Sequence, residues 1–137
     1  DQDNLKRLRQ LRGPDHPDTL ISANNLARDL RGLLRYEQAR QLDEDTLPRC
    51  RRVLGEDHPH TLRSAVSLGA TLWELGQYEQ ARQLGEDTLA RCHRVLGDEH
   101  PDTVRSVRGL AAVLARLGEH DQACRREGVT EQTGTSA

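Results

Sequence analysis

Apolar residues recur at spacings of three and four along most of the chain, which is the spacing of one face of an α-helix. In the middle of the chain these apolar or small residues are Leu62, Ala65, Leu68, Gly69, Leu72 and Leu75. Asp57 or His58 can cap the start of this helix, and Gly76 suits a left-handed turn at its end. A second stripe runs from Tyr78 to Gly97. No segment alternates as a β-strand does, so the sequence predicts an all-α fold of antiparallel helix pairs.

The chain is built from an internal repeat. The dipeptide His-Pro occurs three times, 42 residues apart, at 16–17, 58–59 and 100–101. When 16–57 is laid over 58–99 without gaps, about 26 of the 42 positions are identical. Such a period is typical of a solenoid, in which each unit buries its apolar face against its neighbours. We expect repeats at 16–57, 58–99 and 100–127, the second helix of a preceding repeat at 1–15, and a disordered tail at 128–137.

The order of small and apolar residues within one unit resembles the tetratricopeptide repeat. The residues that carry this resemblance are Gly69, Leu72, Gly76, Tyr78 and Ala81. The 42-residue period, the linker G-E-D-H-P and the segment A-N-N-L-A at 23–27 resemble more specifically the kinesin-light-chain type, and bacterial signalling proteins carry similar arrays. The resemblance implies a right-handed superhelical solenoid. Its first helices would line a concave groove that binds peptides or partner proteins.

Two departures from the repeat pattern carry structural consequences. Leu34 stands where the next two units have a turn glycine, and a non-glycine residue in a left-handed turn costs about 1 kcal/mol. Arg126 and Glu131 stand where the preceding unit has Leu84 and Leu89. We therefore expect the last helix to be short, frayed or polar on its outer face.

Composition narrows the class of protein. The chain has 137 residues, of which 34% are hydrophobic and 31% charged, with a net charge of −2. No apolar run is long enough to span a membrane, and the near-neutral charge argues against a dedicated nucleic-acid binder. Three cysteines without a CxxC motif fit a reducing, cytoplasmic compartment. The absence of Met suggests a fragment or a processed product, and the excess of Arg over Lys suggests a GC-rich bacterial genome.

The histidines and cysteines raise the question of a metal site. The histidines that precede proline are His16, His58 and His100. Equivalent residues of successive repeats lie roughly 10 Å apart, too far to share one ion. We expect these histidines to cap helices, and Cys50 and Cys92 to be buried as small hydrophobic residues. Glu44 and Asp45 are interpreted as solvated, or as partners of Arg40. The chain has no nucleophile or phosphate-binding motif, so we predict no catalytic residue, metal or cofactor.

The resemblance also indicates which side chains line the groove. The candidate peptide-binding residues are Asn24, Asn25, Arg28, Arg63, Trp73, Arg105 and Arg108. The planar fork of arginine suits carboxylates, which favours an acidic ligand. Asn25 stands where family members use Asn to bind a peptide backbone or terminal carboxylate, but Ser67 and Gly109 occupy the matching positions. Two readings of Trp73 stay open: a binding hot spot, or packing between repeats, with the arginines then paired to Asp and Glu.

Three functions follow as hypotheses. The first is a protein–protein interaction scaffold that binds a peptide or partner segment in the groove. The second is a sensor or regulatory arm of a larger signalling ATPase, in which the groove holds its own chain until a ligand displaces it. The third is a self-assembly module, because exposed repeat ends would allow homo-oligomers to form. We expect neither an enzyme nor a binder of nucleic acid or membrane.

Overall fold

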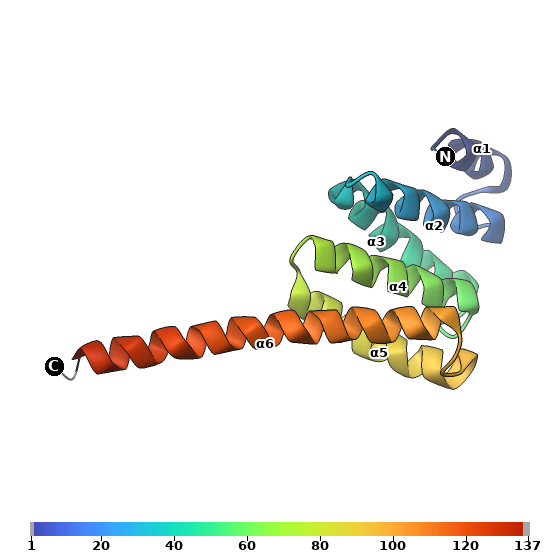
Figure 1. The fold of residues 1–137 in the computed structure, drawn as a ribbon. Coiled ribbons are helices and arrows are strands. Elements are labelled where there is room, and N and C mark those ends of the chain that lie inside the picture. The colour runs from blue at the N-terminus through green and yellow to red at the C-terminus, as the bar shows by residue number, and fades with distance from the viewer. Residues whose placement is uncertain (1, 136–137) are drawn as a thin grey trace.

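The computed structural model describes residues 2–135, with side chains through Glu119 (Figure 1). It contains α1 (Gln2–Arg12), α2 (Pro17–Gly32), α3 (Tyr36–Val53), α4 (Pro59–Glu74), α5 (Tyr78–Leu96) and α6 (Pro101–Thr135). Within this range there is no β-strand. Each helix packs on the next, and the first helices of successive units, α2, α4 and α6, also touch one another. The fold is therefore the predicted all-α helical solenoid.

Every first helix begins with the same histidine cap. The Nδ1 atoms of His16, His58 and His100 each accept a hydrogen bond, at 3.1 Å, from the backbone N–H two residues further on. Proline follows each histidine and occupies the first helical turn, where its missing N–H costs nothing. The prediction that these histidines cap helices is confirmed, and His58 fills the role for which Asp57 was the alternative.

The turns between paired helices have the expected left-handed residue. Leu34 has φ 63° and Gly76 has φ 76°. The N–H of Arg35 bonds to the carbonyl of Leu30 at 2.9 Å, and the equivalent bond after Gly76 has the same length. These bonds satisfy carbonyls at the helix end that would otherwise lack a partner. Leu34 adopts the glycine-like conformation despite its side chain, as the repeat pattern predicts.

The core lies between the helices as two separate apolar clusters, so it is thin and elongated. One contains Leu5, Ala23, Leu26, Leu30 and Ala39, and the other contains Leu47, Ala65, Leu68, Leu72, Ala81 and Val113. Cys50 and Cys92 are fully buried, as predicted, and burial raises the pKa of both thiols to about 11. The side chain of Cys124 lies outside the described residues.

Ion pairs tie the loops to the second helices in a repeated way. Arg49 of α3 pairs with Asp15 at 2.8 Å, and Arg91 of α5 pairs with Asp57 at 3.0 Å. The predicted pairing of second-helix carboxylates with arginine one turn away holds for Arg82 and Glu86, at 3.0 Å. Arg40 pairs instead with Glu37, which lies three residues before it on α3.

The C-terminal end of the fold differs from expectation. The repeat pattern predicts a turn at Gly118 and disorder from 128, whereas α6 continues as one helix from Pro101 to Thr135 and extends away from the stack (Figure 1). Residues 136–137 lie outside the described range. The physical reason is the missing apolar stripe, because Arg126 and Glu131 replace leucines that a folded-back helix would bury. Ala111 is accordingly exposed, although its counterpart Ala27 is fully buried.

Candidate functional site

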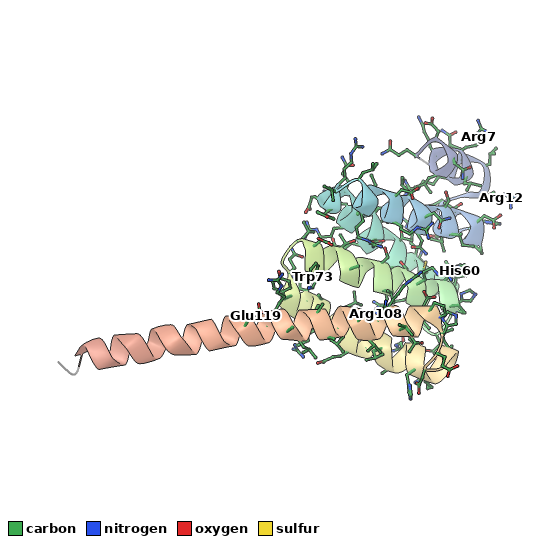
Figure 2. All side chains as sticks on the ribbon, in the orientation of Figure 1. Arg7, Arg12, His60, Trp73, Arg108 and Glu119 are labelled. Atoms are coloured by element: carbon green, nitrogen blue, oxygen red, sulfur yellow. The ribbon has the colours of Figure 1, made fainter. Side chains whose placement is uncertain are left out.

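A single groove runs across α2, α4 and α6. It encloses a hollow of about 560 Å³. All seven candidate residues named from the sequence line it: Asn24, Asn25, Arg28, Arg63, Trp73, Arg105 and Arg108. Figure 2 shows Trp73 near the C-terminal end of α4 and Arg108 on the neighbouring α6. The structure thus brings the predicted residues to one surface, and their role in binding remains a proposal.

The groove residues meet because the repeat places them on the same helix face. Asn24 and Arg108 occupy one repeat position, and Arg63 and Arg105 occupy another, three residues earlier in each helix. Side chains three or four residues apart share a helix face. That face lies away from the stripe that packs against α3 and α5, so it stays open to a ligand.

The arginines of the groove fall into two kinds. Arg63 and Arg105 flank Asp102, which is 2% exposed, with Nε of Arg63 at 3.5 Å from Oδ2 and Nη1 of Arg105 at 3.3 Å from Oδ1. Arg28 and Arg108 are exposed, and within the described part of the chain neither has a hydrogen bond or ion pair. The internal pairing that one interpretation predicts is therefore present for Arg63 and Arg105, whereas Arg28 and Arg108 line the hollow without such a partner in the described part of the chain.

Asn24 is the most unusual polar group in the groove. Its side chain is only 6% exposed, and neither its amide oxygen nor its amide nitrogen has a hydrogen-bond partner among the described residues. An unsatisfied buried polar group costs about 1–3 kcal/mol. Neither amide atom reaches the solvent surface, so a peptide backbone that pairs with both recovers that cost only after the Asn24 side chain turns toward the hollow. Asn25, the next residue, is exposed and lines the same hollow.

Trp73 packs between repeats at the edge of the groove. It packs against the second apolar cluster, and its ring meets the Tyr78 ring edge-on with centroids 6.5 Å apart. The Arg116 guanidinium lies 5.8 Å from the indole ring on another side. These contacts from α5 and α6 hold the indole in place while part of it lines the groove. The packing interpretation of Trp73 is therefore confirmed, and its role as a binding hot spot stays a prediction.

A buried polar network beside the groove escaped the sequence analysis. We call it the polar seam: Arg31 of α2, Asp43 of α3, and Ser67 and Thr71 of α4. Ser67 and Thr71 donate hydroxyl hydrogen bonds to the carboxylate of Asp43 at 3.3 and 3.4 Å, and Arg31 donates to the carbonyl and hydroxyl of Ser67 at 3.1 Å. Burial raises the pKa of Asp43 to about 7. The missed signal was Asp43 itself, which stands where the next repeat has Gly85.

Among the described residues, no group of three or more His, Cys, Asp or Glu side chains could hold a metal ion. Over the same range no helix is long and apolar enough to cross a membrane. What the groove offers is guanidinium groups, an unpaired amide and an immobilised indole.

Stacked helix pairs with an open groove along their first helices define a helical-repeat binding scaffold. The family model of the tetratricopeptide repeat matches residues 1–48, 30–92 and 66–124, which together span nearly the whole chain. The chain belongs to the tetratricopeptide repeat family, whose repeats generally mediate protein–protein interaction. A comparison with curated proteins returns no match.

Proposed function

We propose that this protein is a scaffold that binds an acidic segment of a partner protein along the groove of α2, α4 and α6. One observation carries the proposal: the unpaired guanidiniums of Arg28 and Arg108 and the unpaired amide of Asn24 line the same hollow. The chain as a whole has a net charge of −2. The cationic groove is thus a local feature, which attracts carboxylates to this face.

Each groove residue has a distinct role in the proposal. Arg28 and Arg108 donate paired hydrogen bonds to ligand carboxylates, for which the guanidinium fork is suited. Asn24 and Asn25 bind the backbone of the segment. Trp73 supplies an apolar surface that loses little entropy on binding, because its packing already fixes it.

Arg63 and Arg105 contribute in a second way. Their shared partner Asp102 is buried and neutralises part of their charge. Each guanidinium remains about half exposed or more, at 50% and 63%, so a ligand carboxylate competes with Asp102 for them. We therefore expect them to attract the segment more weakly than Arg28 and Arg108 do.

The kinesin-light-chain-like subtype, the bacterial type and the cytoplasmic location are also part of the proposal. The period and the A-N-N-L-A segment support a kinesin-light-chain-like array of bacterial type. Two fully buried cysteines without disulfides, Cys50 and Cys92, are compatible with the cytoplasm. An alternative use of the same groove is regulatory, as the arm of a larger signalling ATPase that holds a segment of its own chain.

Self-assembly is a second candidate, favoured by one observation on α6. Val107 and Leu114 are 49% and 46% exposed, whereas their counterparts Ala65 and Leu72 are buried under α5. The uncovered face of α6 could accept a helix of a second copy. Light scattering across a concentration series tests this candidate, which requires a mass that rises with concentration and falls after Leu114→Glu.

Calorimetric titration tests the scaffold proposal. The probe is an amidated peptide of alternating Glu and Asp, with a Lys peptide of equal length as the control ligand. The double variant Arg28→Ala/Arg108→Ala removes the two unpaired groove charges. It should lower the affinity for the acidic peptide at least about tenfold, because hydrogen bonds to charged groups contribute about 1.5–3 kcal/mol each. The matched variant Lys6→Ala/Arg7→Ala removes two exposed charges from α1, outside the groove. Equal loss in both variants would show only a general charge effect and contradict the proposal.

A further inference from the structure

The groove crosses two seams between repeats, and the seams differ in chemistry. At the polar seam, Asp43 and Ser67 fill the space between α3 and α4. The equivalent residues at the next seam, between α5 and α6, are Gly85 and Gly109. Val113 takes the place of Thr71, which has the same shape. The second seam therefore lacks a carboxymethyl group and a hydroxymethyl group that the first seam contains.

The hollow reaches core residues at the second seam, where these side chains are missing. At the second seam it is lined by Ala65, Ala81, Gly85, Thr88 and Val113, together with Gly109 at its mouth. We call these six residues the glycine pocket. Their counterparts one repeat earlier include Ala23, Ala39, Asp43 and Thr46, and none of these lines the hollow. At the glycine pocket the hollow thus reaches buried residues of the second helix α5, whereas the equivalent residues of α3 do not border it.

The lining of the glycine pocket selects an apolar occupant. Its one hydroxyl, Thr88 Oγ1, already donates to the carbonyl of Leu84 at 2.7 Å. Ala81 and Val113 are 2% and 3% exposed, so a group that enters the pocket meets the second apolar cluster. A polar group placed here would find only the acceptor oxygen of Thr88 among the six side chains and would lose its water.

The size of the missing groups limits the occupant further. The Asp and Ser side chains absent from the second seam have six non-hydrogen atoms in total. A leucine or isoleucine side chain has four, whereas an indole with its methylene has ten. Leu110 borders the space on one side, because its Cδ1 would lie 3.4 Å from a Cβ at Gly85. The smaller aliphatic group therefore suits the remaining space better than an indole. Arg108, which precedes Gly109 on α6, and Arg105 lie on the rim. Carboxylates on either side of the aliphatic residue would meet these guanidiniums.

We propose that the glycine pocket binds one branched aliphatic side chain of the acidic segment and so fixes the register of that segment in the groove. This inference rests on the proposed function, since it adds an anchor to the same acidic ligand. The electrostatic contacts alone leave the segment free to slide by a residue. An aliphatic anchor with carboxylates on both sides removes that freedom, because the pocket lies at one place along the groove.

The test uses three amidated peptides, Glu-Asp-Glu-X-Glu-Asp-Glu, in which X is Leu, Ala or Trp, titrated calorimetrically into the full chain. The protein variants are Gly109→Leu and its matched control Gly118→Leu on the same helix. A Cβ at either glycine meets no atom within 4 Å, so the first side-chain atom of each replacement has room. Both remove a glycine from a helix, which favours folding, and a thermal melt checks that both variants stay folded.

The proposal predicts that the Leu peptide binds the unmodified protein at least about tenfold more tightly than the Ala peptide. Gly109→Leu should erase that preference while the Ala peptide keeps its affinity, and Gly118→Leu should preserve it. Equal binding of the Leu and Ala peptides overturns the anchor but leaves the acidic groove standing. Tighter binding of the Trp peptide overturns the aliphatic assignment. If none of the peptides binds, the proposed function fails and the anchor fails with it.

Discussion

The hydroxyl of Ser67 donates a hydrogen bond to the fully buried carboxylate of Asp43 at 3.3 Å, which links the groove wall to the interior of the solenoid. Ser67 lines the groove and also accepts a hydrogen bond from Arg31, whereas Asp43 belongs to the second helix of the preceding unit. The order of the groove at this seam therefore depends on a titratable group that no ligand touches directly.

The first prediction concerns the pH dependence of stability. Burial raises the pKa of Asp43 from 3.8 to about 7, although Ser67, Arg31 and Thr71 lower it and Glu44 raises it slightly. The native state thus binds this proton more tightly than the unfolded state. Its contribution to stability is fully present below pH 3.8 and is lost as pH rises through about 7, with a slope of at most about 1.4 kcal/mol per pH unit.

The measurement for this prediction is urea unfolding of the wild type and of Asp43→Asn between pH 4 and 8. The variant cannot titrate at this position, and its amide oxygen still accepts the two hydroxyl bonds. The difference in the free energy of unfolding should grow in favour of the variant as pH rises. All other carboxylates are common to both proteins and cancel in that difference. A difference that does not change with pH would contradict the raised pKa.

The second prediction concerns Asp102, which sits between Arg63 and Arg105. Asp102→Asn removes the charge that neutralises both guanidiniums, so the acidic peptide should bind several-fold more tightly, since the change is about 1 kcal/mol. The melting temperature should fall at the same time, because a buried ion pair is lost. Asp98→Asn is the matched control, as it removes an exposed carboxylate outside the groove. Affinity that rises equally in both variants would show that only net charge matters.

The third prediction concerns the left-handed Leu34. Its φ of 63° is strained for leucine, and the side chain is 72% exposed, so Leu34→Gly relieves strain and loses little packing. We expect a gain of up to about 0.6 kcal/mol in the free energy of unfolding, which is the strain of about 1 kcal/mol less the entropy of the added glycine. Leu33 is 64% exposed with φ −88°, so Leu33→Gly should destabilise the protein. Chemical denaturation of both variants decides the point, and a loss at Leu34 would contradict it.

Residues that repeat with the period could be predicted well. The cap at His58, the left-handed turn at Leu34 and the burial of Cys50 all follow from repeat position, because local geometry decides them. The groove position of Arg108 follows in the same way, since helix faces are fixed by the periodicity of 3.6 residues per turn.

Residues that break the period could not be predicted, because their effect depends on neighbours in space. Asp43 reads as one more acidic residue of a solvated helix until Ser67 is placed against it. Gly118 reads as a turn by analogy with Gly76, yet it lies inside α6. A glycine permits a turn without requiring one, and the segment that follows lacks the apolar stripe that would stabilise a folded-back helix.

The central claim is that the groove of α2, α4 and α6 binds acidic segments, and a proton–nitrogen correlation spectrum tests it most directly. The chain contains one tryptophan and three asparagines, so the Trp73 indole and the side-chain amides of Asn4, Asn24 and Asn25 are separate reporters. On titration with the Glu-Asp peptide, we predict saturable shifts of Trp73, Asn24 and Asn25, with Asn4 on α1 unmoved. Saturable shifts that spare these three groove reporters and move Asn4 would place the ligand elsewhere and contradict the account.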